Sequence, residues 1–193
     1  MNITALMGSN SSSDPVAIGR TADRLILAAT ALGCAVAVYL GTLYGGLSLA
    51  MGGAAAILLI AGFGAQMLSW DSGFCEGLAR RGRFVVRFDN RDTGLSTKFE
   101  QHPVDLHDLI GAASIGDLET VRSLAAYRLA DLADDGAGLA RALGLDQVHV
   151  VGASMGGMVA QLVAIHHPEL VTTLTSMMSS TGSPDVGQWT PEA

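Results

Sequence analysis

The ten residues Val148-His149-Val150-Val151-Gly152-Ala153-Ser154-Met155-Gly156-Gly157 decide how this chain folds. An apolar β-branched run leads into a G-x-S-x-G motif at residues 152–156, and a helix-forming stretch that ends before Pro168 follows the motif. A serine at such a junction lies on a sharp turn, and the flanking glycines let strand and helix approach closely. The positive end of the following helix faces the same point. The motif therefore predicts that Ser154 is a nucleophile.

Outward from this junction, strands and helices alternate. Short apolar runs bounded by turn residues predict strands at residues 57–60, 84–88, 147–151 and 170–178. Helices are expected at about residues 69–81, 117–143 and 157–166. Such alternation is typical of a parallel sheet with right-handed crossovers, and near-continuous apolar strands indicate cover on both faces. The expected fold class is α/β, a partial doubly wound, mostly parallel sheet.

Residues from about 55 to 182 resemble the first part of an α/β-hydrolase fold protein. The resemblance is carried by Ala61-Gly62-Phe63-Gly64, by the segment from Phe88 to Ser96, and by the segment from Val150 to Gly157. The Asn-Arg-Asp-Thr-Gly-Leu-Ser form at residues 90–96 is similar to the serine carboxylesterase and methylesterase branch of that family. The α/β-hydrolase type of sheet is therefore expected.

The resemblance also implies roles for individual residues. Ser154 would be the nucleophile, and the backbone amides of Phe63 and Met155 would form the oxyanion hole. The geometry of the turn and of the oxyanion loop would depend on a set of glycines: Gly62, Gly64, Gly152, Gly156 and Gly157. The family normally has a histidine directly before Gly62, where this chain has Ala61. The change removes a side chain that usually helps to hold the loop.

The nucleophile type narrows the reaction. A serine at this turn favours acyl transfer to water through an acyl-serine, whereas an aspartate would favour epoxide or haloalkane hydrolysis. The expected partner is a small-molecule ester, a carboxylic or methyl ester. Neither Cys34 nor Cys75 lies at a metal-ligand spacing, and no cofactor or metal is expected. A net charge of −7 argues against nucleic acid as a partner.

The histidine that should take the serine proton is not evident. His166 and His167 follow Ser154 by 12 and 13 residues, which places them roughly 18 Å away at the far end of the same helix. His149 is expected to be a sheet side chain, and the remaining two histidines, His102 and His107, are expected in a loop. The catalytic triad, whose members follow in the chain order Ser, acid and then His in this fold, therefore lacks an identifiable histidine.

The acid is equally hard to assign. Asp185 is interpreted as a loop residue, and Asp89 and Asp92 as structural residues of their loop with Arg91 as an available partner. The acidic cluster is interpreted as a solvated helix face; it comprises Asp131, Asp134 and Asp135. The readable chain is thus expected to stop before the lid, the last strands, the acid and the histidine.

A serine nucleophile without an identifiable acid and histidine is compatible with two alternative functions. The first is a serine hydrolase that is impaired in this form, with little turnover of its own. The alternative is a non-catalytic remnant or ligand-binding protein that keeps the hydrolase scaffold. An uncovered strand edge also predicts self-association.

The N-terminal third departs from the family pattern. Residues 1–24 read as a flexible polar terminus, residues 25–53 as an apolar Ala/Gly/Leu-rich segment, and residues 54–193 as the hydrolase part. A helix is expected over residues 25–40. The uncharged stretch from Leu25 to Gly46 is long enough for a membrane anchor, and a buried helix or a pair of hydrophobic strands is the alternative. Localisation stays undecided between the cytoplasm and the membrane.

Overall fold

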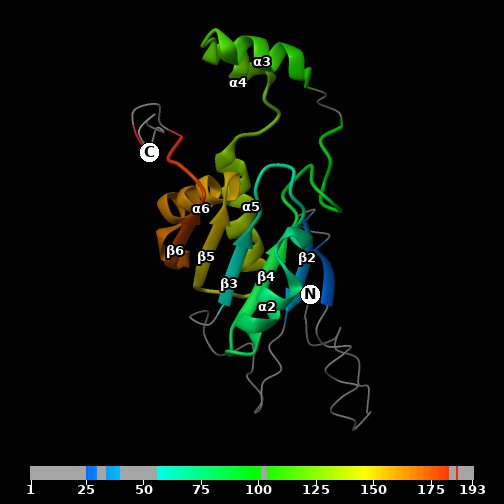
Figure 1. Cartoon of the computed structure of the whole chain (residues 1–193), viewed down its shortest axis with the longest axis vertical. Coiled ribbons are helices and arrows are strands. Elements are labelled where there is room, and N and C mark those ends of the chain that lie inside the picture. Colours follow the sequence, from blue (N-terminus) through cyan, green and yellow to red (C-terminus); the bar gives the residue numbers. More distant parts are fainter. Residues whose placement is uncertain (1–24, 30–33, 40–55, 101–103, 183–185, 187–193) are drawn as a thin grey trace.

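The computed structural model describes residues 25–29, 34–39, 56–100, 104–182 and 186. These residues form a sheet of six strands in the order β1-β2-β4-β3-β5-β6 (Figure 1). Strands β3 to β6 run parallel to one another, and β1 and β2 are antiparallel to their neighbours. The strands are β1 (Leu25–Ala29), β2 (Cys34–Tyr39), β3 (Ala56–Ile60), β4 (Phe84–Phe88), β5 (Val148–Ala153) and β6 (Val171–Met177). The expected mostly parallel α/β sheet is therefore confirmed.

The N-terminal strands correct the sequence-based expectation. Residues 25–40 were expected to be a helix, but β1 pairs with β2, and β2 adds to the outer edge of β4 with Val36 opposite Phe88. The uncharged Ala/Val-rich chain satisfies its backbone donors and acceptors by extending the sheet. The alternative of a hydrophobic strand pair is the one observed. Within the described ranges, no helix has the length and apolarity needed to span a bilayer. Residues 30–33 and 40–46 of the proposed anchor, and the polar terminus, lie outside the described residues.

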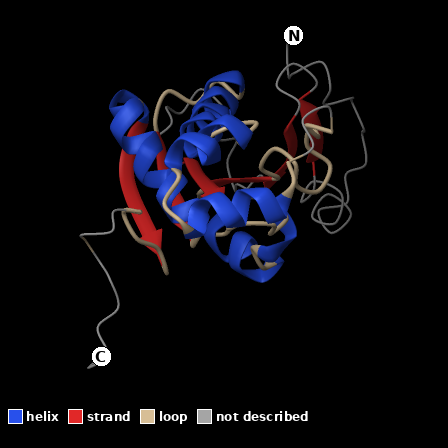
Figure 2. Ribbon diagram, turned by 90° about the horizontal axis from the view of Figure 1, so that it is seen from above, coloured by secondary structure: helices blue, strands red, loops and turns tan. Residues whose placement is uncertain are grey.

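Helices cover both faces of the sheet (Figure 2). Helices α5 (Leu129–Ala142) and α6 (Met155–His166) share one core with Leu58, Ile60 and Phe88 of the strands. Helix α2 (Ser72–Ala79) and the short η3 (Met67–Ser69) share the other core with Leu59 and Val85. Successive strand residues thus point into opposite cores, which explains why every residue of β3 is buried.

Two short helices stand beyond the carboxyl ends of the strands, at the top of Figure 1. They are α3 (Leu106–Ser114) and α4 (Leu118–Leu124), and they pack against each other as a hairpin between β4 and α5. The sequence had predicted one helical region from Asp117 to Leu143. Residues 125–128 interrupt that region, and α3 was not anticipated.

Candidate active site

Ser154 occupies the turn between β5 and α6, as its motif predicted. Its backbone has φ 55° and ψ −124°, a conformation that non-glycine residues rarely adopt. The Ser154 amide donates to the carbonyl of Met177 at 2.9 Å, and the Ser154 carbonyl accepts from the Gly157 amide at 2.9 Å. These two bonds tie the turn to the end of β6 and to the first turn of α6. The serine residue is exposed at the carboxyl edge of the sheet.

Three glycines of the motif are packed so tightly that no side chain fits. A Cβ on Gly152 would overlap the carbonyl oxygen of Gly156, and a Cβ on Gly156 would overlap the carbonyl oxygen of Ile60. A Cβ on Gly157 would come within 2.6 Å of the Ser179 Cβ. The close approach of strand and helix that the motif predicted is therefore observed at the turn between β5 and α6.

The loop after β3 lies directly beside Ser154. A Cβ built on Gly62 would be 3.2 Å from the Ser154 Cβ, and Gly64 has a φ of +66°. Phe63, between them, has an exposed side chain, at 84%. Met155 is the first residue of α6, where backbone amides have no acceptor within the helix. The residues expected to supply the oxyanion donors thus lie on two segments that meet at Ser154.

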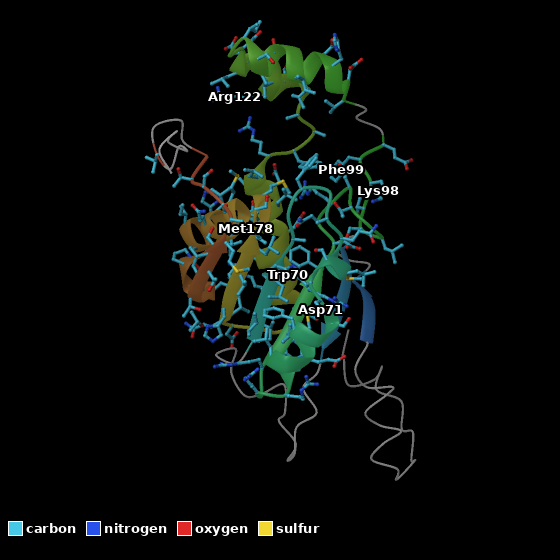
Figure 3. All side chains as sticks on the ribbon, in the orientation of Figure 1. Trp70, Asp71, Lys98, Phe99, Arg122 and Met178 are labelled. Carbon is cyan, nitrogen blue, oxygen red and sulfur yellow. The ribbon has the colours of Figure 1, made fainter. Side chains whose placement is uncertain are left out.

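A cavity of about 900 Å³ adjoins this junction. Phe63 and Met155 line it at the sheet, whereas Leu109 of α3 and Val121 of α4 line it from the hairpin. Figure 3 shows Lys98 and Phe99 on the loop after β4 and Arg122 on the hairpin above it; all three line the same cavity. The cavity thus lies between the carboxyl edge of the sheet and the α3–α4 hairpin.

The wall of this cavity is stiffened by Arg91. Its guanidinium binds both carboxylate oxygens of Asp135 in α5 at 2.7 Å, and it lies 5.2 Å from the ring centroids of both Phe99 and Tyr127. Burial and a hydrogen bond to Asp92 raise the pKa of Tyr127 to about 12. Arg91 was expected to be available to Asp89 and Asp92 of its own loop, but its partner is Asp135, 44 residues away.

The other acidic residues of α5 also have partners, although Asp134 remains 62% exposed, as expected for a solvated helix face. Asp131 accepts from the Arg128 amide at 2.6 Å, and Asp134 lies 2.7 Å from Nε2 of His167. Each carboxylate of this cluster therefore contacts a group on the loop before α5, on the segment after β4 or at the end of α6. The spacing of charges along the sequence gives no sign of the partners of Asp134 and Asp135, which lie 33 and 44 residues away.

Asp89 at the end of β4 has the structural role that was expected of it. This 2% exposed carboxylate accepts from the Met67 amide at 2.6 Å and from the Leu95 amide at 3.1 Å. Its backbone carbonyl accepts from the Ser96 hydroxyl at 2.6 Å. Asp92 accepts from the Phe99 amide at 2.7 Å. The loop from residue 89 to residue 99 is therefore folded around its own aspartates.

The described histidines have partners or positions away from Ser154. His149 Nδ1 is 2.8 Å from the Thr173 hydroxyl, and His167 contacts Asp134 and Arg141. His166 is the last residue of α6, and His107 is an exposed residue of α3. His102 and Asp185 lie outside the described residues. Among the described residues, no three His, Cys, Asp or Glu side chains converge as metal ligands would.

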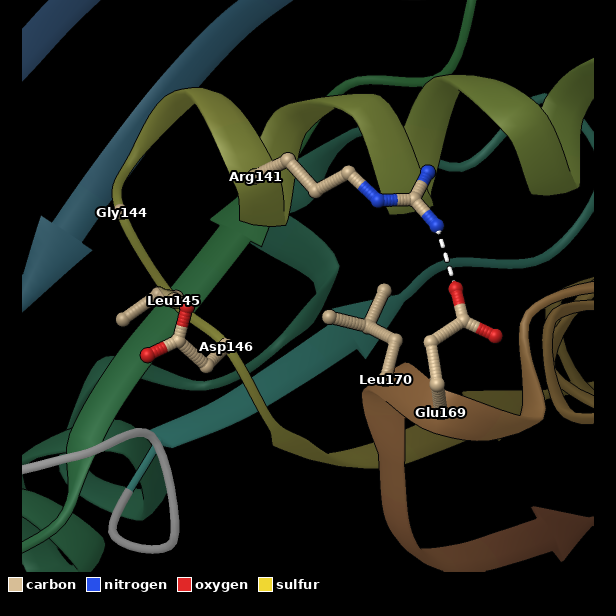
Figure 4. A pocket seen from close by; sticks show the side chains of 6 residues that line it. All are labelled: Arg141, Gly144, Leu145, Asp146, Glu169 and Leu170. Atoms are coloured by element: carbon tan, nitrogen blue, oxygen red, sulfur yellow. Dashed lines mark hydrogen bonds and ion pairs between the residues drawn. The ribbon is translucent and has the colours of Figure 1, made fainter.

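A second hollow, of about 270 Å³, lies beside the loop that leads into β5, at the opposite edge of the sheet from Ser154 (Figure 4). Leu145 and Asp146 line it together with an exposed ion pair, in which Arg141 donates to Glu169 at 2.6 Å. This pair and a backbone hydrogen bond lower the pKa of Glu169. The ion pair joins α5 to the segment before β6 and contributes little stability, because both side chains are largely solvated.

The fold and the junction at Ser154 agree with the comparison against protein families. The family model described as alpha/beta hydrolase fold matches residues 55–192, and the chain belongs to that family. Rhodomycin D methylesterase DauP of Streptomyces sp. (strain C5) is 35% identical over 126 residues, and rhodomycin D methylesterase DnrP of Streptomyces peucetius is 34% identical over the same length. Each match covers 64% of this chain and 35% of the relative, so the chain spans about a third of the length of these methylesterases.

Solved structures give the same fold. A hydrolase from Pseudomonas aeruginosa PA01 has a TM-score of 0.53 and 25% identity, covering 83% of this chain and 47% of that protein. A membrane phospholipase A, described as a bacterial virulence factor, has a TM-score of 0.50 and 29% identity, covering 73% of this chain and 35% of that protein. The chain is therefore similar to hydrolases in both sequence and structure.

Proposed function

We propose that this chain carries the nucleophile of a serine ester hydrolase. The observation that carries the proposal is the backbone of Ser154, which is held at positive φ on a strand–helix turn with Gly62 packed against it. The curated methylesterases that resemble the chain support an ester, a carboxylic or methyl ester, as substrate. Epoxide opening through an aspartyl ester is not proposed, because a serine occupies the turn.

In the proposed reaction, Ser154 Oγ bonds to the acyl carbon and gives its proton to a general base. The tetrahedral oxyanion accepts hydrogen bonds from the amides of Phe63 and Met155, which then stabilise charge that exists only near the transition state. Collapse breaks the bond to the alcohol oxygen, and the alcohol leaves with the proton from the base. Water then cleaves the acyl-serine and releases the carboxylic acid.

The general base is the component that the described residues do not supply. His149 and His167 are engaged with other side chains, and His166 lies at the far end of α6. We therefore propose that the 193-residue chain by itself turns esters over slowly. Oxyanion stabilisation and binding without a working triad leave about 10³–10⁴ over the reaction in water.

A fluorophosphonate probe tests the proposal, because it reacts with activated serines by the same attack. Since no described residue acts as the base, we expect slow labelling that is confined to Ser154 in the intact chain and absent in Ser154→Ala, as read by peptide mass spectrometry. Labelling at other serines with equal yield in Ser154→Ala would contradict it. A chain that binds apolar esters in the 900 Å³ cavity but never labels would favour the alternative, a ligand-binding scaffold.

Self-association is a separate proposal. On one side β6 pairs with β5, and no described strand pairs with its other side. Its middle residues are exposed, Leu174 among them at 41%. Such an edge offers free backbone groups to a second chain. Size-exclusion chromatography at several concentrations is expected to give a concentration-dependent elution volume, and a constant monomer volume would contradict this.

A further inference from the structure

We infer that Asn90 is a positioning residue for the oxyanion loop, acting through the backbone carbonyl of Ala61. This inference rests on the proposed function, because it concerns the loop that would bring the Phe63 amide to the reacting oxygen. Asn90 is the second residue after β4 and is 3% exposed. Its Nδ2 donates to the Ala61 carbonyl at 3.1 Å, across 29 residues of sequence.

Asn90 acts together with the residue before it. Asp89 Oδ1 accepts from the Met67 amide at 2.6 Å, which is the far end of the same loop. Two consecutive side chains at the end of β4 therefore hold the first and last residues of the 61–67 segment. Phe63 lies between these two points, and the position of its amide depends on both.

The Ala61 carbonyl lies in a crowded place. A Cβ built on Gly156 would be 2.6 Å from the Ala61 oxygen, so this carbonyl lies against the first turn of α6. The following residue, Gly62, is the one packed against Ser154. Rotation of the Ala61–Gly62 peptide would move Gly62 relative to Ser154 and would turn the Phe63 amide. The hydrogen bond from Asn90 opposes that rotation.

Asn90 occupies this position at a cost. Its Oδ1 is buried and has no hydrogen-bond partner among the described residues, which is unfavourable for a polar atom. A residue that only filled space would avoid this cost with an apolar side chain. The donor on Nδ2 is what distinguishes an asparagine here. Asn90 uses that donor to bind the backbone of Ala61, the residue directly before Gly62.

The experiment compares Asn90→Asp and Asn90→Ala in the full chain with Leu145→Ala. Asn90→Asp keeps the size and loses the donor, whereas Asn90→Ala avoids a buried charge in case the first variant does not fold. Leu145→Ala truncates a core side chain beside the loop into β5, at the opposite edge, and controls for destabilisation. Two measurements are made: the kinetics of Ser154 labelling by a fluorophosphonate, and hydrogen–deuterium exchange of the 61–67 peptide.

We expect both Asn90 variants to lower the maximal labelling rate at least about tenfold, since losing one oxyanion donor outright costs about 10²–10³. The probe concentration for half-maximal rate should change less than about twofold, because the lost interaction acts in the transition state. Exchange in the 61–67 peptide should accelerate in these variants and stay unchanged in Leu145→Ala.

Three results would overturn the inference: an unchanged maximal rate, a loss confined to probe binding, or unchanged exchange in the 61–67 peptide. If Ser154 does not react in the unmodified chain, the proposed function fails. Exchange then decides the inference alone, with acceleration supporting the role of Asn90 in holding the loop and no change refuting it.

Discussion

Arg91 and Asp135 form a two-point ion pair that joins the loop after β4 to helix α5. Both oxygens of the carboxylate are bound at 2.7 Å, and the two side chains are only 18% and 20% exposed. The hydrogen bond to Asp135 raises the pKa of Arg91, which therefore stays charged. The pair fixes the guanidinium over the faces of the Phe99 and Tyr127 rings at the wall of the cavity.

Removal of this pair should destabilise the fold. We expect Arg91→Ala to cost about 2–4 kcal/mol in the free energy of unfolding, because it leaves a partly buried carboxylate unpaired. Arg91→Lys should recover only part of this, since an ammonium cannot bind two oxygens in parallel. Urea denaturation measures both variants.

The exposed pair of Arg80 with Glu76 is the matched control. Its side chains are 66% and 43% exposed at 3.4 Å, and Arg80→Ala should cost less than about 1 kcal/mol. A loss for Arg91→Ala no larger than that for Arg80→Ala would contradict the role given to Asp135.

Tyr127 should make stability fall at high pH. Burial and the Asp92 carboxylate raise its pKa to about 12 from the ordinary value of 10.0, so the folded state favours the neutral phenol. This contribution is fully present below about pH 10 and is lost as the pH rises toward about 12. Denaturation midpoints measured across this window should fall more steeply for the unmodified chain than for Tyr127→Phe. Equal slopes would show that Tyr127 is not the group responsible.

Two glycine substitutions should differ sharply in their effect. Gly156→Ala places a methyl group on the carbonyl oxygen of Ile60, so strand and helix must separate, at about 3 kcal/mol or more. Gly111 lies in α3 with open space around the added carbon, and Gly111→Ala should stabilise by about 0.5–1 kcal/mol. Thermal unfolding of both variants tests this. If Gly156→Ala unfolds at the same temperature as the unmodified chain, the close contact between Gly156 and Ile60 is refuted.

The Cys75 thiol should react slowly in the folded chain. It is completely buried on the inner face of α2, and burial raises its pKa, although Arg87 opposes the shift. Burial limits access of a reagent to the thiol, and the raised pKa lowers the concentration of reactive thiolate. In a Cys34→Ser background, a thiol reagent should modify Cys75 at a rate that denaturant accelerates by orders of magnitude. Rapid modification without denaturant would mean that this side of the sheet opens readily.

The parallel part of the fold was predictable because its strands are short apolar runs bounded by turns. Strand β4 has the expected bounds, β3 begins one residue earlier than expected, and β6 is one residue shorter at each end. Strands β1 and β2 were misread as a helix because an uncharged Ala/Leu/Val run has no clear period. Pairing with β4, rather than local propensity, decides their conformation.

In the candidate site, too, the local features could be predicted from the sequence and the long-range contacts could not. Ser154 and its glycines were identified from one contiguous motif that reports a local turn. Asn90, Asp89 and Asp135 act on residues 29, 22 and 44 positions away, and local patterns in one sequence contain no trace of such pairings. An asparagine two positions after a buried strand was the only available signal.

The α3–α4 hairpin lines the cavity beside Ser154 but does not hold the turn on which Ser154 lies. Its helices pack mainly on each other. The turn at Ser154 and the 61–67 loop beside it are instead hydrogen-bonded to Met177 of β6 and to Asp89 after β4. Sequence drift or wholesale exchange of the hairpin would therefore change the shape of the cavity beside Ser154 without moving the turn that holds this serine. The hairpin and the turn can therefore change independently in evolution.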